Sequence, residues 1–238
     1  MALTRPTRHR RNDHVPAERQ PDTEPERPGT ELEQADPGPE RADPEPGHLD
    51  DETAAVALCQ ELNDAGYTAE ISEGRVVVSP WQSMESSCIV DRLSDLLIPL
   101  KLANGWRFHH NLAVRIPPFL DHRLPDLMVT ARDAERHDHL RMKGGSALLV
   151  VEVCSPGTYS ADWHEKPVDY ARAGVPLLLI VDPLSDPKTV TLMSDPLDDV
   201  APDDMREPYR QVVTVEAGEV LELPEPFGVK LETDTLFE

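Results

Sequence analysis

Two continuous apolar runs, separated by a helical segment, constrain the fold of this chain more than any other feature. Ala147–Val153 and residues 177–181 are among its most apolar stretches, and runs of this kind suit strands that are buried on both faces. Residues 162–173, which lie between them, have the pattern of a helix, and Gly174 follows where that helix would end. Strand, helix and strand in this order predict a βαβ crossover with parallel neighbours, and therefore an α/β fold.

Further helices and strands surround this unit. A helix is expected from about Thr53 to Gly66, and an apolar stripe along residues 89–100 predicts a second, core-facing helix that ends near Pro99. The other expected strands are Thr68–Ser72, Arg75–Ser79, residues 112–116, 126–130, 189–193 and 209–215, and Val220–Leu223. Ala217-Gly218 is expected to form a hairpin turn near the C-terminal end. Together these elements predict one mixed sheet, flanked by helices, with a β-rich C-terminal end.

The first 50 residues differ in composition from the rest of the chain. They contain nine prolines, many acids and arginines, and few large apolar residues. Such a segment cannot bury enough surface to offset its conformational entropy. We therefore predict a disordered Pro/Glu/Arg-rich tail over residues 1–50 and a single domain over residues 51–238. No stretch resembles a secretory signal or a membrane span, so a cytoplasmic protein without membrane contact is expected.

Charge and cysteine content narrow the expected functions. The formal net charge is −22 at pH 7. Because affinity for nucleic acid comes largely from Lys and Arg on phosphates, a basic surface that coats DNA is not expected. An acidic cleft that binds a metal ion remains compatible with this charge. The cysteines Cys59, Cys88 and Cys154 have no CxxC spacing, which predicts reduced, buried thiols rather than a zinc site or disulfides.

Two acids next to predicted strands indicate a metal site. Glu152 lies inside an apolar run, where a carboxylate without a partner is costly, so a functional role explains it better than packing does. Asp126 follows Pro125, and an ordinary turn would explain this pair equally well. Adjacent strands lie ~4.8 Å apart, so acids on paired strands can share one ion. The backbone carbonyl of Val153 could supply a further oxygen ligand.

A lysine on the following helix completes a possible catalytic set. Asp162, Lys166 and Tyr170 are spaced four residues apart and therefore share one face of the helix. An exposed Asp–Lys pair is the alternative interpretation, but the turn at residues 155–158, which leads out of the Glu152 strand, favours a functional role. A lysine beside metal-bound carboxylates can orient or activate the attacking water. Asp126, Glu152 and Lys166 are thus the minimum set for metal-dependent cleavage of a phosphodiester bond.

The combined motif is similar to that of a known family. Its segments are Pro125-Asp126, residues 151–156, Asp162, Lys166-Pro167, Tyr170-Ala171, residues 173–176 and Val181-Asp182. They resemble the Uma-two family of restriction endonucleases, which belongs to the PD-(D/E)XK nuclease superfamily. The likeness extends to the opening hairpin around Glu70 and to a closing segment over residues 221–237, and it covers about 170 residues.

The resemblance implies a restriction-endonuclease-like mixed β-sheet core with Asp126 and Glu152 as metal ligands. In the superfamily's simplest pattern the lysine stands two residues after the second acid, where this chain has Cys154. The family places the lysine on the helix, which corresponds to Lys166, and Glu70 would be an accessory acid. Mg²⁺ is the expected cofactor, with Mn²⁺ as an alternative, and DNA is the expected substrate. The likeness also makes a homodimer reasonable, since two-fold pairing is the commonest oligomer.

Two hypotheses of different classes follow. The first is a metal-dependent endonuclease that hydrolyses DNA, with RNA or a nucleotide as a weaker alternative substrate. The second is a catalytically silent nuclease fold that serves as a binding or regulatory module, with a protein as its partner. The acidic composition and an aromatic content of only 5% favour the second, because few side chains could stack on bases. The intact set of Asp126, Glu152 and Lys166 favours catalysis.

Overall fold

A computed structural model of the chain describes residues 46–201 and 206–238. The predicted disordered tail therefore lies outside the described residues, except for its last five positions. There the first helix, α1 (Pro46–Asp64), begins seven residues before the expected start at Thr53. A proline is compatible with the first turn of a helix. Residues 46–52 carry no apolar stripe, so periodicity did not reveal the first turns.

The central sheet has six strands in the order β11-β10-β9-β8-β6-β3. Strands β8 (Ala147–Val153) and β9 (Leu177–Asp182) pair in parallel, which confirms the βαβ crossover, and all other neighbours in this sheet are antiparallel. The remaining strands of the sheet are β3 (Arg107–His109), β6 (Leu127–Thr130), β10 (Thr189–Pro196) and β11 (Tyr209–Glu216). The predicted mixed α/β core is confirmed.

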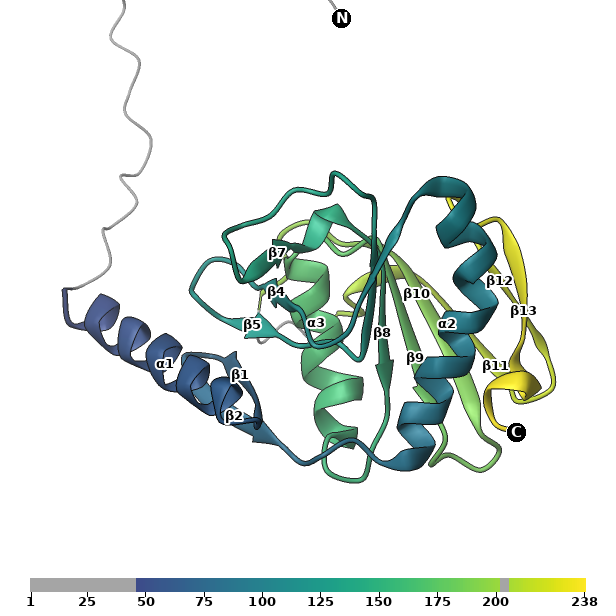
Figure 1. The fold of residues 1–238 in the computed structure, drawn as a ribbon, viewed down its shortest axis with the longest axis horizontal. Coiled ribbons are helices and arrows are strands. Elements are labelled where there is room, and N and C mark those ends of the chain that lie inside the picture. Colours follow the sequence, from purple (N-terminus) through teal and green to yellow (C-terminus); the bar gives the residue numbers. More distant parts are fainter. Residues whose placement is uncertain (1–45, 202–205) are drawn as a thin grey trace, which may run out of the picture. The chain divides into compact units, whose positions relative to one another are not determined.

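Helices cover both faces of this sheet (Figure 1). On one face, α2 (Met84–Asn104) packs against side chains of β8 and β9 that include Leu149, Val151 and Leu179. On the other face, α3 (Lys166–Arg172) contributes Tyr170 and Ala171 to a second core with Val150, Leu178 and Ile180. Successive residues of a strand point to opposite faces. Position 152 therefore shares the face of Val150 and points toward α3.

Helix α2 continues past the residue that was expected to end it. Pro99 lies inside the helix, which stops only at Gly105, where the backbone is left-handed with φ 68°. Pro99 is exposed, so the carbonyl four residues earlier, which loses its helical donor, lies on the solvent side of the helix. Exposure at this position explains why the proline is tolerated. Leu96, predicted to be core, is 44% exposed.

A second sheet of five short strands carries the N-terminal hairpin. Its order is β2-β1-β5-β4-β7, and the Glu73-Gly74 turn joins β1 to β2 as predicted. The strands are β1 (Thr68–Ser72), β2 (Arg75–Ser79), β4 (Ala113–Arg115), β5 (His122–Arg123) and β7 (Arg141–Lys143). Strands β5 and β7 were not predicted, because two or three residues give no measurable alternation.

The C-terminal hairpin consists of β12 (Val220–Leu223) and β13 (Val229–Glu232), and a short 3₁₀ helix, Thr233–Leu236, follows it. It packs in the same core as α2. The prediction of a hairpin turn at Ala217-Gly218 is wrong. This turn joins β11 to β12, but β11 pairs with β10 and β12 pairs with β13. Within residues 46–201 and 206–238, no helix has the length and apolar composition needed to cross a bilayer.

Candidate active site

Strand β8 delivers Glu152 to a buried position under α3. Only 2% of Glu152 is exposed. The Lys166 ammonium donates to its Oε2 at 2.7 Å, and the Tyr170 hydroxyl donates to its Oε1. The sequence placed Lys166 and Tyr170 on one helix face, and both in fact meet the same carboxylate. The apolar strand thus tolerates its charge because each oxygen has a donor.

An irregular helix start brings Asp162 to the same lysine. A five-residue π-helix, Ala161–Glu165, leads directly into α3, and Pro167 occupies the first turn of α3. Asp162 is buried, accepts a hydrogen bond from Thr158 Oγ1 at 2.6 Å and pairs with Lys166 at 2.8 Å. Single π turns inside helices are frequent at functional sites. Lys166 is therefore held between two carboxylates and is itself buried.

Asp126 lies immediately before β6, beside the end of β8. The backbone N–H of Val153 donates to its Oδ2 at 2.7 Å, and Gln82 Nε2 donates to Oδ1 at 3.2 Å. Strands β6 and β8 are neighbours, with Leu127 opposite Val151. Asp126 and Glu152 therefore reach one pocket from adjacent strands, as their positions in the sequence predicted. Val153 meets Asp126 through its N–H, and the expected role of its carbonyl stays a prediction.

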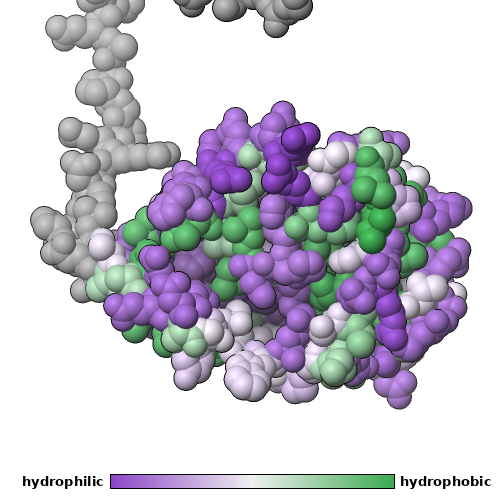
Figure 2. Space-filling model, in the orientation of Figure 1, coloured by the Kyte–Doolittle hydropathy of each residue, from purple (hydrophilic) through white to green (hydrophobic). Residues whose placement is uncertain are grey.

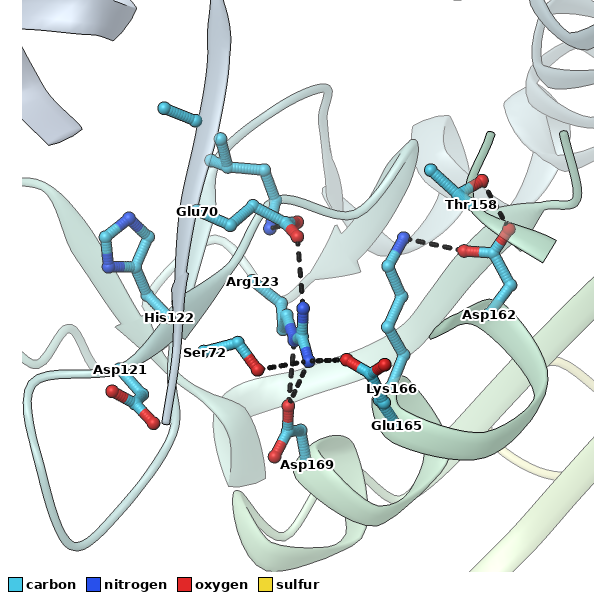
Figure 3. A network of polar contacts seen from close by, with 12 residues as sticks. Glu70, Ser72, Asp121, His122, Arg123, Thr158, Asp162, Glu165, Lys166 and Asp169 are labelled. Atoms are coloured by element: carbon cyan, nitrogen blue, oxygen red, sulfur yellow. Dashed lines mark hydrogen bonds and ion pairs between the residues drawn. The ribbon is translucent and has the colours of Figure 1, made fainter. Parts of the chain in front are cut away.

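Glu70 of the pocket lining and Arg123 belong to a network of polar contacts near Lys166 and Asp162 (Figure 3). Glu70, buried on β1, accepts from the Leu124 N–H at 2.6 Å and pairs with Arg123 at 3.4 Å. The Arg123 guanidinium also donates to Asp169 of α3 at 2.8 Å and to Ser72 at 2.8 Å. Arg123 thus connects the N-terminal hairpin to the helix that carries Lys166.

Sequence reasoning did not identify Arg123 or Gln82. Arg123 stands three residues before Asp126 and is fully buried. Its closeness to the Pro125-Asp126 pair was the only signal that could have singled it out. Gln82 lies in an exposed segment between β2 and α2, and nothing in the local sequence distinguishes it. Only the folded chain brings these two side chains to the acids.

The site is a small cavity of about 90 Å³ with an excess of acid groups. Its lining includes Glu70, Asp126, Glu152 and Asp162, with Lys166 as the only cationic side chain in the lining; the other lining residues are Thr68, Ser79, Pro80, Trp81, Gln82, Ser86, Asn111, Leu124, Val153, Ser155 and Thr158. Each carboxylate is stabilised by hydrogen bonds, but four acids face one lysine.

This crowding shifts the protonation of the acids. The pKa of Glu152 is raised to about 8, chiefly by burial, with Lys166 opposing the shift and the nearby Asp126 and Asp162 adding to it. Burial likewise raises the pKa of Asp126, against the Val153 N–H and Lys166, which lower it. Burial would lower the pKa of Lys166, but the surrounding carboxylates outweigh this and raise it. The site therefore favours binding of additional positive charge.

Cys154 has the surroundings of a structural thiol rather than of a nucleophile. Burial and the acids Asp162 and Asp182 raise the pKa of its thiol well above the ordinary range. The reactive form of cysteine is the thiolate, and these surroundings disfavour it. The interpretation of Cys154 as a buried structural thiol agrees with the structure, in which the residue is buried and free.

The raised pKa of Glu152 predicts how stability depends on pH in the absence of metal. An ordinary glutamate ionises near 4.5, and folded Glu152 ionises near 8. Between these values the folded protein holds a proton that the unfolded chain has released, so stability falls as the pH rises. We expect the wild type to lose stability relative to Glu152→Gln between about pH 5 and pH 8. Urea denaturation at the two pH values measures this difference, and a pH-independent difference would contradict it.

Comparisons with known proteins agree with this architecture. The model of the Uma2 family, described as "Putative restriction endonuclease", matches residues 55–235, a span that contains every site residue described above. No curated protein matches the chain. A solved structure of a "putative nuclease belonging to DUF820" from Anabaena variabilis superposes with a TM-score of 0.52 and 17% identity, covering 71% of this chain and 89% of that one. The structural likeness supports the fold, and the family match covers most of the sequence. The chain therefore belongs to the Uma2 family of restriction-endonuclease-type proteins.

Proposed function

We propose that this protein is a metal-dependent endonuclease that hydrolyses phosphodiester bonds in DNA. The observation that carries the proposal is the arrangement of Glu152, Asp126 and Lys166. Two carboxylates from adjacent strands and a buried lysine meet in one solvent-accessible pocket. Family membership supports nuclease chemistry in general, and the choice of DNA and of the metal ion is our inference.

The donor set fits a hard divalent cation. Among residues 46–201 and 206–238, no three His, Cys, Asp or Glu side chains converge as a ready metal cage. Mg²⁺ is usually bound through only one or two carboxylates together with waters, so Asp126 and Glu152 suffice, with the Val153 carbonyl as a further candidate. The excess of acid groups in the pocket also favours a cation. Mn²⁺ fits the same oxygen donors.

The bound metal would supply Lewis-acid stabilisation of the phosphate and lower the pKa of its bound water. Lys166, held in place by Asp162 and Glu152, would orient the attacking water and offset negative charge that develops on the phosphate. Tyr170 fixes the position of the Glu152 carboxylate from the opposite side. Glu70, paired with Arg123, would act as an accessory acid at the pocket wall.

The first test is cleavage by the wild-type protein. Supercoiled plasmid, circular single-stranded DNA and RNA are each incubated with Mg²⁺ or Mn²⁺, with EDTA as the metal-free control. We expect nicked and linear plasmid in the presence of metal and none with EDTA. Preferential cleavage of RNA would contradict the choice of DNA. Light scattering of the active sample measures whether the expected homodimer forms.

One observation favours the second hypothesis, a nuclease fold kept as a binding module. Both oxygens of Glu152 accept hydrogen bonds from Lys166 and Tyr170, so side chains of the protein alone satisfy this carboxylate. A silent module would show no turnover with any metal. Absence of cleavage of all three substrates by folded protein, together with no Mn²⁺ binding in calorimetry, would support this alternative.

A further inference from the structure

A second cavity lies at the edge of the central sheet, away from the acidic pocket. It has a volume of about 230 Å³ and lies between β3 and the segment that leads from β6 to β7. Its lining is dominated by basic side chains: Arg107, His109, Arg132, Arg136, His139 and Arg141. In Figure 2, strongly hydrophilic residues gather at the top of the face, over the segment that leads to β7.

Three of these arginines carry positive charge that no acid neutralises. Arg107, Arg132 and Arg136 are exposed, and none forms an ion pair with another residue of the described part of the chain. Asp138 is the only acid in the lining. Its carboxylate is already occupied by the Arg141 side chain and by the backbone N–H groups of Leu140 and Arg141.

Other charges in the same segment do not cancel this surplus. Glu135 pairs with Lys143 at 2.6 Å, and both line a different cavity together with Asp133. Positive charges also act on His109: its pKa is lowered by burial and then by Arg107, Arg136, His110 and Lys101. A chain with a net charge of −22 therefore contains a local cationic surface, which its overall composition did not predict.

This surface is connected to the acidic pocket by two paired strands. Asp126 immediately precedes β6, and Thr130 at the other end of β6 pairs with Arg107 on β3. His110, just after β3, contacts the backbone carbonyl of Asp126 through Nδ1 at 3.1 Å. Thr130 is four residue steps along the chain from Asp126, which corresponds to ~14 Å in an extended strand. Strand β3 is the edge of the sheet, so no further strand covers this path.

We propose that Arg107, Arg132 and Arg136 bind backbone phosphates of the polynucleotide that is cleaved at the acidic pocket. One strand of a duplex carries a phosphate every ~3.4 Å of helix axis, so the arginines would contact phosphates about four nucleotides from the scissile bond. Exposed arginines without acid partners are suited to this role, because the guanidinium matches phosphate geometry. This inference rests on the proposed nuclease function, since it names the surface that holds the same substrate.

The test measures binding in the absence of metal, so that it does not depend on catalysis. Fluorescent 24-base-pair DNA and RNA duplexes are titrated at several salt concentrations between about 50 and 200 mM. The variant is Arg107→Gln/Arg132→Gln/Arg136→Gln. The control, Lys188→Gln/Arg210→Gln/Lys230→Gln, removes the same charge from side chains that pair with acids elsewhere. Circular dichroism verifies that both variants are folded.

We expect the arginine variant to bind DNA at least ~10-fold more weakly than the wild type at low salt. Its plot of log affinity against log salt should be less steep by about 2 to 3, because each lost phosphate contact removes about 0.9 from the slope. The control variant should retain the wild-type slope. If the arginine variant has a less steep plot than the wild type for RNA but not for DNA, the surface binds RNA instead of DNA.

The results separate this inference from the proposed function. If the wild type cleaves DNA but the arginine and control variants bind with equal slopes, the surface assignment is wrong and the nuclease proposal stands. If the salt dependence of binding is less steep for the arginine variant than for the wild type, but the wild type cleaves nothing, the surface binds polynucleotide and the nuclease proposal is wrong. Absence of any DNA or RNA binding by the wild type at about 50 mM salt would overturn the surface assignment as well.

Discussion

Replacement of Glu152 by glutamine is expected to reduce metal-dependent DNA cleavage by at least ~10³-fold. Loss of a Lewis-acid contact costs several kcal/mol of transition-state stabilisation, and each ~1.4 kcal/mol corresponds to a factor of ten in rate. The carboxylate would hold the metal ion, and it also positions Lys166 at 2.7 Å. A neutral amide of the same shape keeps the packing but provides neither the charge nor the second acceptor oxygen.

The same substitution should leave the fold intact. Burial raises the pKa of Glu152, which means that its negative charge is costly in this position, and a neutral amide of the same shape does not carry that cost. Lys166 also retains Asp162 as a partner at 2.8 Å. We therefore expect the loss of cleavage to occur without a loss of folded protein, which circular dichroism and urea denaturation measure.

A nearby acid provides the matched control for this experiment. Glu165 precedes Lys166 in the chain, but its side chain is 58% exposed and pairs with Arg123 at 3.3 Å rather than with the lysine. Glu165→Gln should cleave plasmid at a rate within about a factor of three of the wild type, since exposed ion pairs contribute little. Equal cleavage rates for Glu152→Gln and the wild type would exclude Glu152 from catalysis.

Replacement of Arg123 by methionine is expected to lower the free energy of unfolding by ~3–5 kcal/mol, the range observed when one partner of a buried ion pair is removed. The guanidinium is fully buried and pairs with Glu70 and Asp169, while a further donor reaches Ser72. Methionine would fill similar space but would leave the buried Glu70 without its arginine partner and Asp169 with only Arg172. Urea denaturation of the purified variant measures the loss.

Two further variants make this prediction specific. Arg123→Lys retains the charge but loses the planar fork that reaches four side chains, so its stability should fall between the wild type and Arg123→Met. Lys143→Met removes an ion pair that is shorter, 2.6 Å against 3.4 Å for Arg123–Glu70, but exposed to solvent. Solvent screening should make its effect on stability small. An Arg123→Met protein as stable as the wild type would show that the buried network does not support the fold.

The elements that sequence analysis predicted correctly are those whose patterns are local. The apolar runs of β8 and β9 predicted both strands, and the helix between them predicted that the strands pair in parallel. The four-residue spacing of Asp162, Lys166 and Tyr170 predicted that they lie on one face of a helix. This prediction was possible because helix periodicity depends only on positions within the same segment. The sequence also predicted that Glu152 lies in a buried strand, and its role in catalysis stays a prediction.

The errors occurred where contacts between distant segments decide the outcome. Pro99 remains in α2 because its position is exposed in the folded protein. The turn at Ala217-Gly218 joins different sheets because β12 pairs with β13, which no local signal reveals. The basic cavity at Arg107 and Arg136 was missed since a net charge says nothing about where charges gather.

The sequence by itself determined that a βαβ unit presents an acid, a lysine and a tyrosine around the end of a buried strand, since strand and helix periodicities are intrinsic to those segments. Only the tertiary structure decided which groups complete the site. Gln82 reaches Asp126 across 44 positions of the chain, and Arg123 reaches Glu70 across 53. Long-range contacts of this kind depend on how the sheets and helices pack. For that reason the charge balance of the pocket is a property of the folded chain.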